Sequence, residues 1–175
     1  MTVKNCLIVV DFQNDFVDGS LGFAGAEKLD QIIESKIKDY LNNNHDLLFT
    51  YDTHYEDYLE TQEGKRLPIL HCIENTPGHE IYGNTAKYVK NAKAVFKKNT
   101  FGSLDLGNFL RKENYDQIEL VGLVTNMCVV SNAIIAKAAL PEARIVVDRK
   151  ASMSFDEDLH HKTFDLLKGI QIDII

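Results

Sequence analysis

Short apolar strands alternate with amphipathic helices along almost the whole chain, and this alternation limits the possible folds more than any other feature. Residues 3–10 are a continuous apolar run rich in β-branched side chains, and residues 28–41 carry apolar side chains at helical spacing. The expected strands are 3–10, 47–51, 94–96, 118–124, 144–147 and 169–175, and the expected helices are 28–41, 104–111, 127–139 and 157–167. Such alternation is typical of parallel βαβ units. The sequence therefore predicts a three-layer α/β/α sandwich with a mainly parallel sheet, as a single domain over residues 1–175.

Composition and charge suit such a domain and exclude some partners. A formal net charge of -7 argues against a nucleic-acid partner, which would require a basic face. No apolar run approaches the roughly 20 residues that span a bilayer, and the first run ends in Asp11, unlike a signal peptide. Three cysteines, an odd number without an export signal, indicate free thiols in a reducing compartment. We therefore expect a cytoplasmic protein with no membrane association.

Polar residues follow five of the expected strands. In chain order they are Asp11, then Asp52 and His54, then Lys97 and Lys98, then Thr125, Asn126 and Cys128, then Asp148. In an open parallel sheet, ligands bind at the carboxyl ends of the strands. The sequence therefore predicts one site at this edge. Residues 53–88 are too long for an ordinary connection and are expected to form a binding loop.

Cys128 is the candidate nucleophile because it stands at the start of an expected helix, directly after an apolar strand. The partial positive charge of a helix N-terminus favours the thiolate, and its free N–H groups can stabilise an oxyanion. A small buried side chain at a strand–helix junction explains the position equally well. Cys6 lies within a strand and Cys72 lies in the long loop, so both are interpreted as structural.

Attack of a thiol on an amide requires a group that takes the thiol proton and delivers it to the leaving nitrogen. No histidine follows a strand near Cys128, whereas Asp11 ends an apolar strand where burial would raise its pKa. A lysine after the third strand would supply positive charge, and strand alternation sends only one of Lys97 and Lys98 into the site. The simpler alternatives are a capping role for Asp11 and a solvated lysine.

Asp52 and His54 form a candidate metal site, because residues two apart share a face in an extended chain. His71 can supply a third ligand from the long loop, and Glu60 or Glu63 a fourth. Carboxylate and imidazole ligands suit a divalent ion such as Zn, Mn, Fe or Mg. The alternatives are a hydrogen-bonded Asp–His turn and a partly buried His71.

Four segments, in order, resemble the motifs of the isochorismatase-like cysteine hydrolases, the superfamily that includes the nicotinamidases. They are residues 10–16 (VDFQNDF), residues 52–54 (DTH) with 71–72 (HC) and 76–78 (TPG), residues 96–101 (FKKNTF), and residues 122–129 (GLVTNMCV). In that superfamily the first acid, a lysine three residues before an aromatic residue, and the cysteine are catalytic. The resemblance therefore implies a catalytic group of Asp11, Lys98 and Cys128, and selects Lys98 over Lys97.

The resemblance also implies details of the site. A cis peptide bond is implied between Leu123 and Val124, with the N–H groups of Val124 and Cys128 forming an oxyanion hole. The implied metal ligands are Asp52, His54, His71 and Glu63, where Glu63 replaces a third loop histidine and Glu60 is the fallback. The chain has no tryptophan to stack on a substrate ring. The substrate pocket is therefore assigned to Phe12, Gln13, Phe16 and Tyr58.

The leading functional hypothesis is hydrolysis of a small-molecule amide through a thioester, with nicotinamide converted to nicotinate and ammonia. Carbamoyl compounds are the next substrate class. An isochorismate-type vinyl-ether hydrolase would share the fold, but those enzymes lack the cysteine. A non-catalytic module that binds a small ligand or metal would not need the Asp–Lys–Cys set. Members of the superfamily often associate, so a homo-oligomer is compatible with the resemblance.

Overall fold

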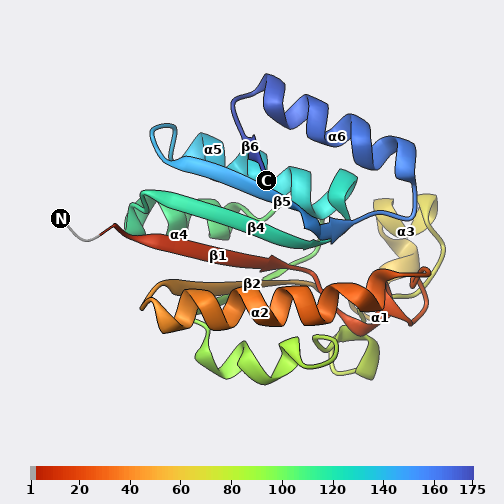
Figure 1. Cartoon of the computed structure of the whole chain (residues 1–175). Helices are drawn as coiled ribbons and strands as arrows, with labels where there is room; N and C mark the ends of the chain where they lie inside the picture. Colours follow the sequence, from red (N-terminus) through yellow and green to blue (C-terminus); the bar gives the residue numbers. More distant parts are fainter. Residues whose placement is uncertain (1–2) are drawn as a thin grey trace.

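A computed structural model describes residues 3–175 and contains one six-stranded sheet in which neighbouring strands are all parallel (Figure 1). The strand order is β3-β2-β1-β4-β5-β6. The strands are β1 (Asn5–Val10), β2 (Asp46–Asp52), β3 (Ala94–Lys98), β4 (Gln117–Leu123), β5 (Arg144–Met153) and β6 (Asp173–Ile174). The predicted α/β/α sandwich with a mainly parallel sheet is confirmed.

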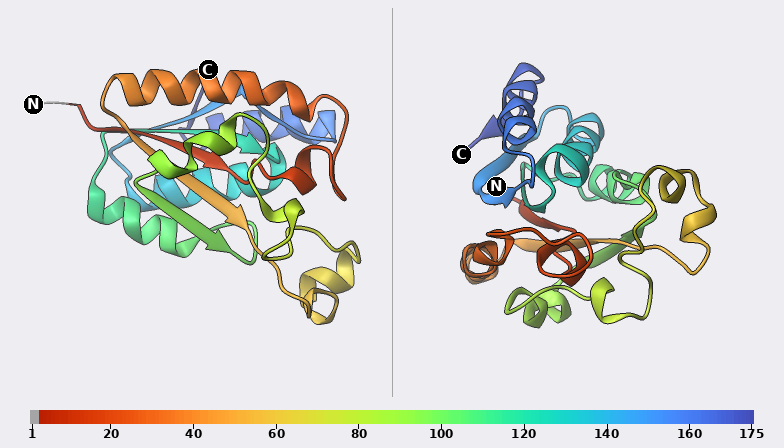
Figure 2. Two further views of the ribbon diagram at one scale, coloured as in Figure 1. Left: turned by 90° about the horizontal axis from the view of Figure 1, so that it is seen from below. Right: turned by 90° about the vertical axis from the view of Figure 1, so that its right-hand side faces the viewer.

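Helices cover both faces of the sheet (Figures 1 and 2). One face carries α4 (Leu104–Glu113), α5 (Val130–Ala139) and α6 (Glu157–Gly169), and the other carries α2 (Leu29–Asn42). The short α-helices are α1 (Asn14–Val17) and α3 (Gln62–Arg66). The 3₁₀ segments are η1 (Ala26–Lys28), η2 (Tyr58–Glu60), η3 (Pro77–His79) and η4 (Thr85–Asn91), and η5 (Thr125–Val129) is a π-helical turn. The α3 helix lies beyond the carboxyl ends of the strands (Figure 2). Among residues 3–175, no helix combines the length and apolar character needed to cross a bilayer.

Strand β1 shows why the sheet is buried on both sides. Its alternate residues Ile8 and Val10 pack with the core beneath α4, α5 and α6. Leu7 and Val9 pack with the core beneath α2. All four side chains are fully buried. A strand with helices on both faces needs apolar side chains at every position, which explains the uninterrupted apolar run in the sequence.

The topology opens a crevice between β1 and β4. The chain leaves β1 towards β2 on one side, and leaves β4 towards β5 on the other, although β1 and β4 are neighbours. The connections after these two strands therefore diverge, as expected at the switch point of an open parallel sheet. Asp11 directly follows β1, and η5, which contains Cys128, begins two residues after β4.

Strand β5 departs from the sequence prediction, since it runs to Met153 instead of ending at residue 147. Between the pairs Leu120–Val147 and Gly122–Ser152, residues 148–151 of β5 stand opposite the single residue Val121 of β4, so the extra residues form a bulge in β5, which pairs again with β4 beyond it. Asp148 consequently lies within the strand, where it contacts Lys36 of α2 at 2.5 Å. The prediction that Asp148 belongs to the strand-end site is wrong.

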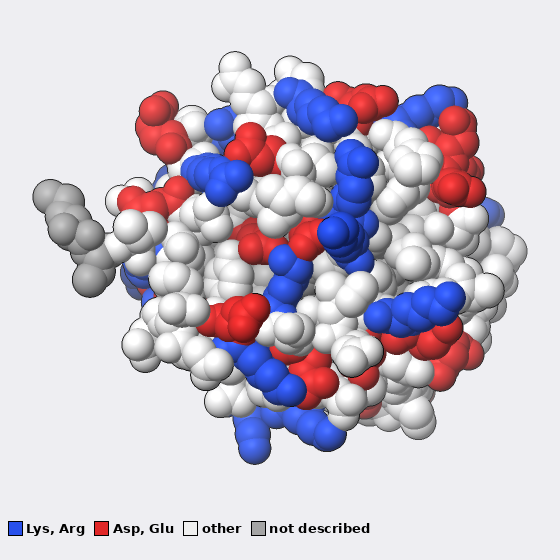
Figure 3. Space-filling model, in the orientation of Figure 1, with Lys and Arg blue, Asp and Glu red and all other residues white. Residues whose placement is uncertain are grey.

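Acidic and basic side chains are interspersed over the face of the molecule seen in Figure 3.

Two other boundaries differ. The helix expected over residues 127–139 begins as η5, a π-helical turn over Thr125–Val129, and continues as the α-helix α5 from Val130. The strand expected over 169–175 is shorter in the structure and comprises only Asp173–Ile174. Residue 169 belongs to α6, which ends at Gly169. Both differences lie at element ends, where local sequence patterns are least informative.

Candidate active site

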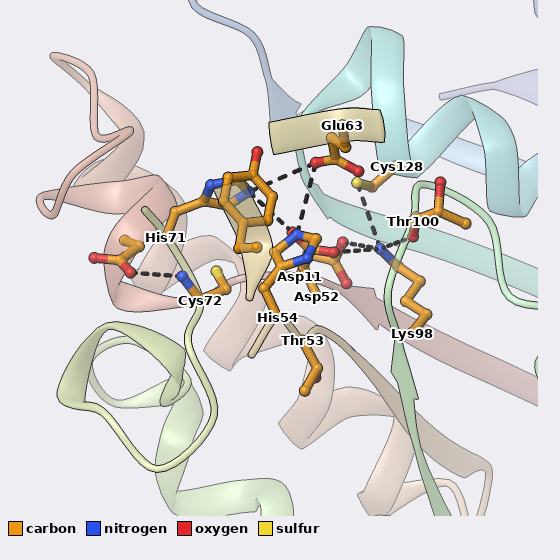
Figure 4. Close-up of polar contacts among 12 residues, drawn as sticks. Asp11, Asp52, Thr53, His54, Glu63, His71, Cys72, Lys98, Thr100 and Cys128 are labelled. Carbon is orange, nitrogen blue, oxygen red and sulfur yellow. Dashed lines mark hydrogen bonds and ion pairs between the residues drawn. The ribbon is translucent and has the colours of Figure 1, made fainter. Parts of the chain in front are cut away.

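Asp11, Lys98 and Cys128 meet at the carboxyl ends of β1, β3 and β4 (Figure 4). The Nζ atom of Lys98 lies 2.5 Å from Asp11 Oδ2 and 3.5 Å from Cys128 Sγ. Asp11 is fully buried, and Lys98 and Cys128 are each 6% exposed. A thiol, a carboxylate and an ammonium group are thus enclosed together, away from bulk water.

The backbone at Asp11 is held in an uncommon conformation. Its φ of 43° lies in the left-handed region, which costs roughly 1–2 kcal/mol for a residue with a side chain. Thr50 of β2 compensates, because its hydroxyl donates to Asp11 Oδ1 at 2.6 Å and its carbonyl accepts the Asp11 N–H at 3.2 Å. These contacts turn the carboxylate towards Lys98 and leave Oδ2 for the ion pair.

Strand alternation separates the two consecutive lysines of β3. Lys98 points into the site, where its Nζ also donates to the carbonyl of Thr100 at 3.0 Å. Lys97 points to the opposite side, has a side chain that is 54% exposed, and pairs with Glu74 at 2.8 Å. Only Lys98 is therefore in reach of Asp11 and Cys128.

Burial raises the pKa of the Cys128 thiol well above its ordinary value; nearby Lys98 opposes this rise and Asp11 adds to it. Burial also raises the pKa of Asp11, against the influence of Lys98. Burial lowers the pKa of Lys98, but the charges of Asp11, Cys128 and Asp52 outweigh it and raise that pKa overall. Lys98 and Asp11 thus form a buried ion pair beside the Cys128 thiol.

Four potential metal ligands converge next to this group. They are Asp52, His54, Glu63 and His71, whose ligand atoms all lie within 4.8 Å of one another. Asp52 Oδ2 lies 3.0 Å from His54 Nε2 and 3.4 Å from His71 Nε2, and Glu63 Oε1 lies 3.6 and 3.8 Å from the same two nitrogens. Tetrahedral ligands with bonds of about 2.0–2.1 Å stand about 3.4 Å apart, so the set fits an ion such as Zn²⁺. Glu60 is exposed in η2 and lies outside the cluster.

The two acidic residues of this set have pKa values that are shifted in opposite directions. Burial raises the pKa of Asp52, but hydrogen bonds from His54 and His71 outweigh it and hold this pKa below its usual range. The pKa of Glu63 is raised mainly by burial and, to a smaller extent, by the negative charge of Asp52. The His71 Nδ1–H donates to the Ile69 carbonyl at 2.8 Å, which directs Nε2 towards the cluster.

A second layer of polar contacts holds the loop that carries His71. Asp15 of α1 accepts the Cys72 N–H on its Oδ2 at 2.7 Å. Gly78 leaves the space for this carboxylate, since a Cβ there would lie 2.1 Å from the same oxygen. Gln13 braces the other side: its side chain donates to the Asp52 carbonyl and accepts the Asp52 N–H, both at 2.8 Å. Gln13 thus orients a candidate ligand and does not line the substrate pocket, contrary to the sequence prediction.

The cavity above Cys128 has a volume of about 650 Å³ and a largely apolar wall. Its side chains include Phe16, Leu21, Phe23, Phe101, Val124, Met127 and Phe155, together with Asp52, Glu63, Arg66, His71 and Cys128. A cavity of this size accommodates a small organic ligand. The peptide bond between Leu123 and Val124 is cis, at the position that the resemblance implied.

Two of the aromatic residues expected in this pocket lie elsewhere. Phe12 is fully buried in the core beneath α2 and packs edge-on against Tyr82 at 5.8 Å. Tyr58 is also fully buried, with its ring 4.5 Å from that of His54 and 5.0 Å from that of His71. Tyr58 therefore packs against two of the candidate metal ligands and not in the cavity. Of the four predicted pocket residues, only Phe16 lines the cavity.

Aromatic residues from three separate loops complete the cavity instead. Phe23 follows α1, Phe101 follows β3 and Phe155 follows β5. Phe23 and Phe155 pack edge to face at 6.1 Å. In the sequence, each of these residues is an aromatic side chain in a polar loop that follows a strand or helix. This pattern does not reveal which loops lie next to one another in the fold.

Asn132 and His160 support the turn that carries Cys128. The Asn132 side chain donates to the carbonyls of Cys128 and Phe101 at 2.8 and 3.0 Å. His160 of α6 has its Nδ1 2.9 Å from the hydroxyl of Thr125 and its ring against Phe164. These contacts tie η5 to α5, α6 and the loop after β3. The sequence contained no signal for either role.

Comparisons with known proteins agree with this architecture. The Isochorismatase domain family matches residues 5–175. The nicotinamidase of Saccharomyces cerevisiae is 26% identical over 212 aligned positions that cover 97% of this chain and 98% of the yeast protein. The crystal structure of nicotinamidase PncA from Bacillus subtilis has a TM-score of 0.86 and 27% identity, covering 98% of this chain and 99% of that one.

A third comparison concerns a metal complex. The structure of the Pyrococcus horikoshii pyrazinamidase in complex with zinc has a TM-score of 0.86 and 23% identity, with 98% of each chain covered. At this level of identity the likeness shows a shared fold. Since the family match extends over nearly all of the described residues, the chain belongs to the isochorismatase family.

Proposed function

We propose that the protein hydrolyses a small carboxamide through a thioester on Cys128, releasing ammonia and a carboxylic acid, as in a nicotinamidase. The observation that carries this proposal is the enclosed Asp11–Lys98–Cys128 group, whose thiol lines a 650 Å³ cavity. A nucleophile, a proton acceptor and a cation in contact are the groups that acyl transfer from an amide requires. The similarity to nicotinamidases supports an amide as the substrate.

The first half of the reaction forms the thioester. Cys128 Sγ attacks the amide carbon while its proton passes to Asp11, which the ion pair with Lys98 keeps ready to accept it. Because burial raises the pKa of the Cys128 thiol, loss of its proton accompanies the attack in this proposal. The N–H groups of Val124 and Cys128 hold the oxygen that becomes negative. Asp11 then gives the proton to the leaving nitrogen, and ammonia departs.

The second half returns the enzyme to its starting state. Water attacks the thioester carbon, and Asp11 takes a proton from that water. The acid product leaves, and the proton returns to Cys128 Sγ. One water is consumed for each amide, with one ammonia and one carboxylic acid released. Lys98 stays protonated throughout and stabilises the negative charge on Asp11 or on the sulfur.

The proposed metal ligands are Asp52, His54, Glu63 and His71, and zinc is the first ion to test. Two imidazoles and two carboxylates with tetrahedral spacing suit it, and the P. horikoshii pyrazinamidase binds zinc on the same fold. When bound, the ion would supply a Lewis acid that orients a substrate ring nitrogen or a water beside Cys128. The chain's own contribution is a preformed, buried ligand set.

Replacing Asp15 by asparagine is expected to weaken zinc binding about tenfold, within the range typical of residues that support metal ligands. The Cys72 N–H would lose a charged acceptor at 2.7 Å, which would loosen the adjacent His71. The dissociation constant, measured by competition with a chromogenic chelator, tests this without reference to activity.

Asp18→Asn is the matched control for the Asp15 variant. Asp18 is an exposed acid at the end of the same short helix. Its variant should bind zinc as the wild type does. Equal zinc affinity in the wild type and the Asp15→Asn variant would refute the supporting role of Asp15.

An amide panel tests the proposed function directly. Nicotinamide, pyrazinamide, benzamide and a carbamoyl amino acid are each incubated with the protein, with and without zinc, and ammonia is measured. We expect at least one ring amide to be hydrolysed with a kcat/KM of about 10⁴ M⁻¹s⁻¹ or more. Absence of ammonia release from every amide under both conditions would overturn the amidase proposal.

A further inference from the structure

Arg66 stands out among the side chains that line the cavity. The other charged groups of the wall are Asp52 and Glu63, and both contact the histidines of the metal cluster. Among residues 3–175, no acidic side chain forms an ion pair with Arg66. The cavity thus has an uncompensated guanidinium group that the proposed chemistry does not use.

The position of Arg66 is built into the fold. It is the last residue of α3, three residues after Glu63, so one short helix contributes both a candidate metal ligand and this cation to the cavity. The Thr61 side chain caps α3 by accepting the Gly64 N–H at 3.0 Å. A Cβ at Gly64 would lie 2.0 Å from the Tyr58 carbonyl oxygen, so the helix packs closely on η2. These contacts hold the backbone from which Arg66 extends.

The surroundings favour a carboxylate as the partner of Arg66. A guanidinium group presents paired N–H donors that match the two oxygens of a carboxylate. Arg66 is exposed, and the wall of the same cavity includes Phe16, Phe23, Phe101 and Phe155, whose low polarity would strengthen an ion pair formed inside the cavity relative to open water. The nearby acids are already engaged with His54 and His71, and they would be neutralised further by a divalent ion.

We propose that the substrate amide carries a carboxylate at a distance from the scissile bond, and that Arg66 binds this carboxylate while Cys128 attacks the amide. The preferred class is then a flat, ring-containing amide with one anionic substituent. This inference rests on the proposed amidase function. It adds a specificity-determining residue and narrows the class of substrate.

The test compares benzamide with the ortho, meta and para isomers of carbamoylbenzoate, which add one carboxylate to the same ring. The wild type should hydrolyse at least one isomer with a higher kcat/KM than benzamide. In Arg66→Ala, the ratio of kcat/KM for that isomer to kcat/KM for benzamide should fall about fivefold, in line with an accessible ion pair. Lys65→Ala removes an exposed cation of the same helix that does not line the cavity, and it should keep the wild-type ratio.

The outcomes separate this inference from the proposed function. An unchanged ratio in Arg66→Ala, or a wild type that prefers benzamide to all three isomers, overturns the role of Arg66 while leaving the amidase intact. If no amide is hydrolysed, the proposed function fails. Calorimetric binding of the isomers and benzamide to Cys128→Ala then decides about Arg66. The role of Arg66 is supported if Cys128→Ala binds one isomer more tightly than benzamide and the Cys128→Ala/Arg66→Ala double variant does not. The role of Arg66 is refuted if Cys128→Ala binds all four compounds equally.

Discussion

Replacing Cys128 by alanine is expected to lower kcat for amide hydrolysis by about 10⁴-fold or more, the largest effect of any single substitution in this chain. Without the sulfur no thioester forms, and neither of the other two cysteines lines the cavity. Ammonia release under single-turnover conditions measures the loss. In the wild type, rapid quenching and intact-mass analysis should detect the mass of the acyl group on the protein, and no such species should form in the variant.

Cys6→Ala is the matched control for the Cys128 variant. Cys6 is a fully buried thiol within β1 and has no contact with the cavity. Its variant removes one thiol but should keep kcat within about twofold. The Cys128 variant should also retain its cooperative thermal unfolding, since a small buried group is lost without burying any charge. Activity at the wild-type level in Cys128→Ala would refute the nucleophile assignment.

Replacing Asp11 by asparagine should lower kcat by about 10³-fold, because the variant has no carboxylate to accept the thiol proton. It should also destabilise the fold by about 3 kcal/mol, the lower end of the range for breaking a buried ion pair. The Lys98 side chain is 3% exposed and would lose its partner at 2.5 Å. The Thr100 carbonyl and Asp52, at 3.0 and 3.7 Å, still contact Lys98 and limit the loss. Steady-state kinetics and urea unfolding measure the two effects separately.

A double variant distinguishes the stability effect from the catalytic one. Asp11→Asn with Lys98→Met removes both charges, so no unpaired charge remains buried, and stability should recover towards that of the wild type. The activity should not recover, since the proton acceptor is still missing. Wild-type kcat in Asp11→Asn would exclude Asp11 as the acceptor. A double variant less stable than Asp11→Asn would contradict the unpaired-charge explanation.

In an open parallel sheet, ligands bind at the carboxyl ends of the strands, and this rule explains which residues of the site could be predicted. Asp11, Asp52 and Lys98 each end or follow an apolar strand, and strands that are parallel and adjacent bring such residues together whatever the loops do. Asp148 did not follow this rule, because it is part of a bulge in β5, and β5 pairs with β4 again beyond that bulge. A bulge depends on pairing with another strand, so the sequence of β5 alone does not reveal it.

Pocket residues were harder to predict than strand-end residues. Phe12 and Phe16 lie close in sequence, yet Phe12 packs beneath α2 and only Phe16 lines the cavity. The difference arises because the chain turns into α1 between them, which sends their side chains in different directions. Phe101 and Phe155 reach the cavity from loops that are distant in the sequence, and Arg66 reaches it from α3 within the long connection.

The sequence by itself determined the layered fold, the parallel sheet and the polar residues at the strand ends. These follow from local periodicity and from the general geometry of βαβ units, which need no knowledge of distant contacts. Only the tertiary structure decided that Cys128 lies beside the Lys98–Asp11 ion pair, that Tyr58 packs against two of the candidate metal ligands, and that Arg66 lines the cavity. Burial, pKa and charge pairing depend on which segments pack together, and distant parts of the chain supply those neighbours.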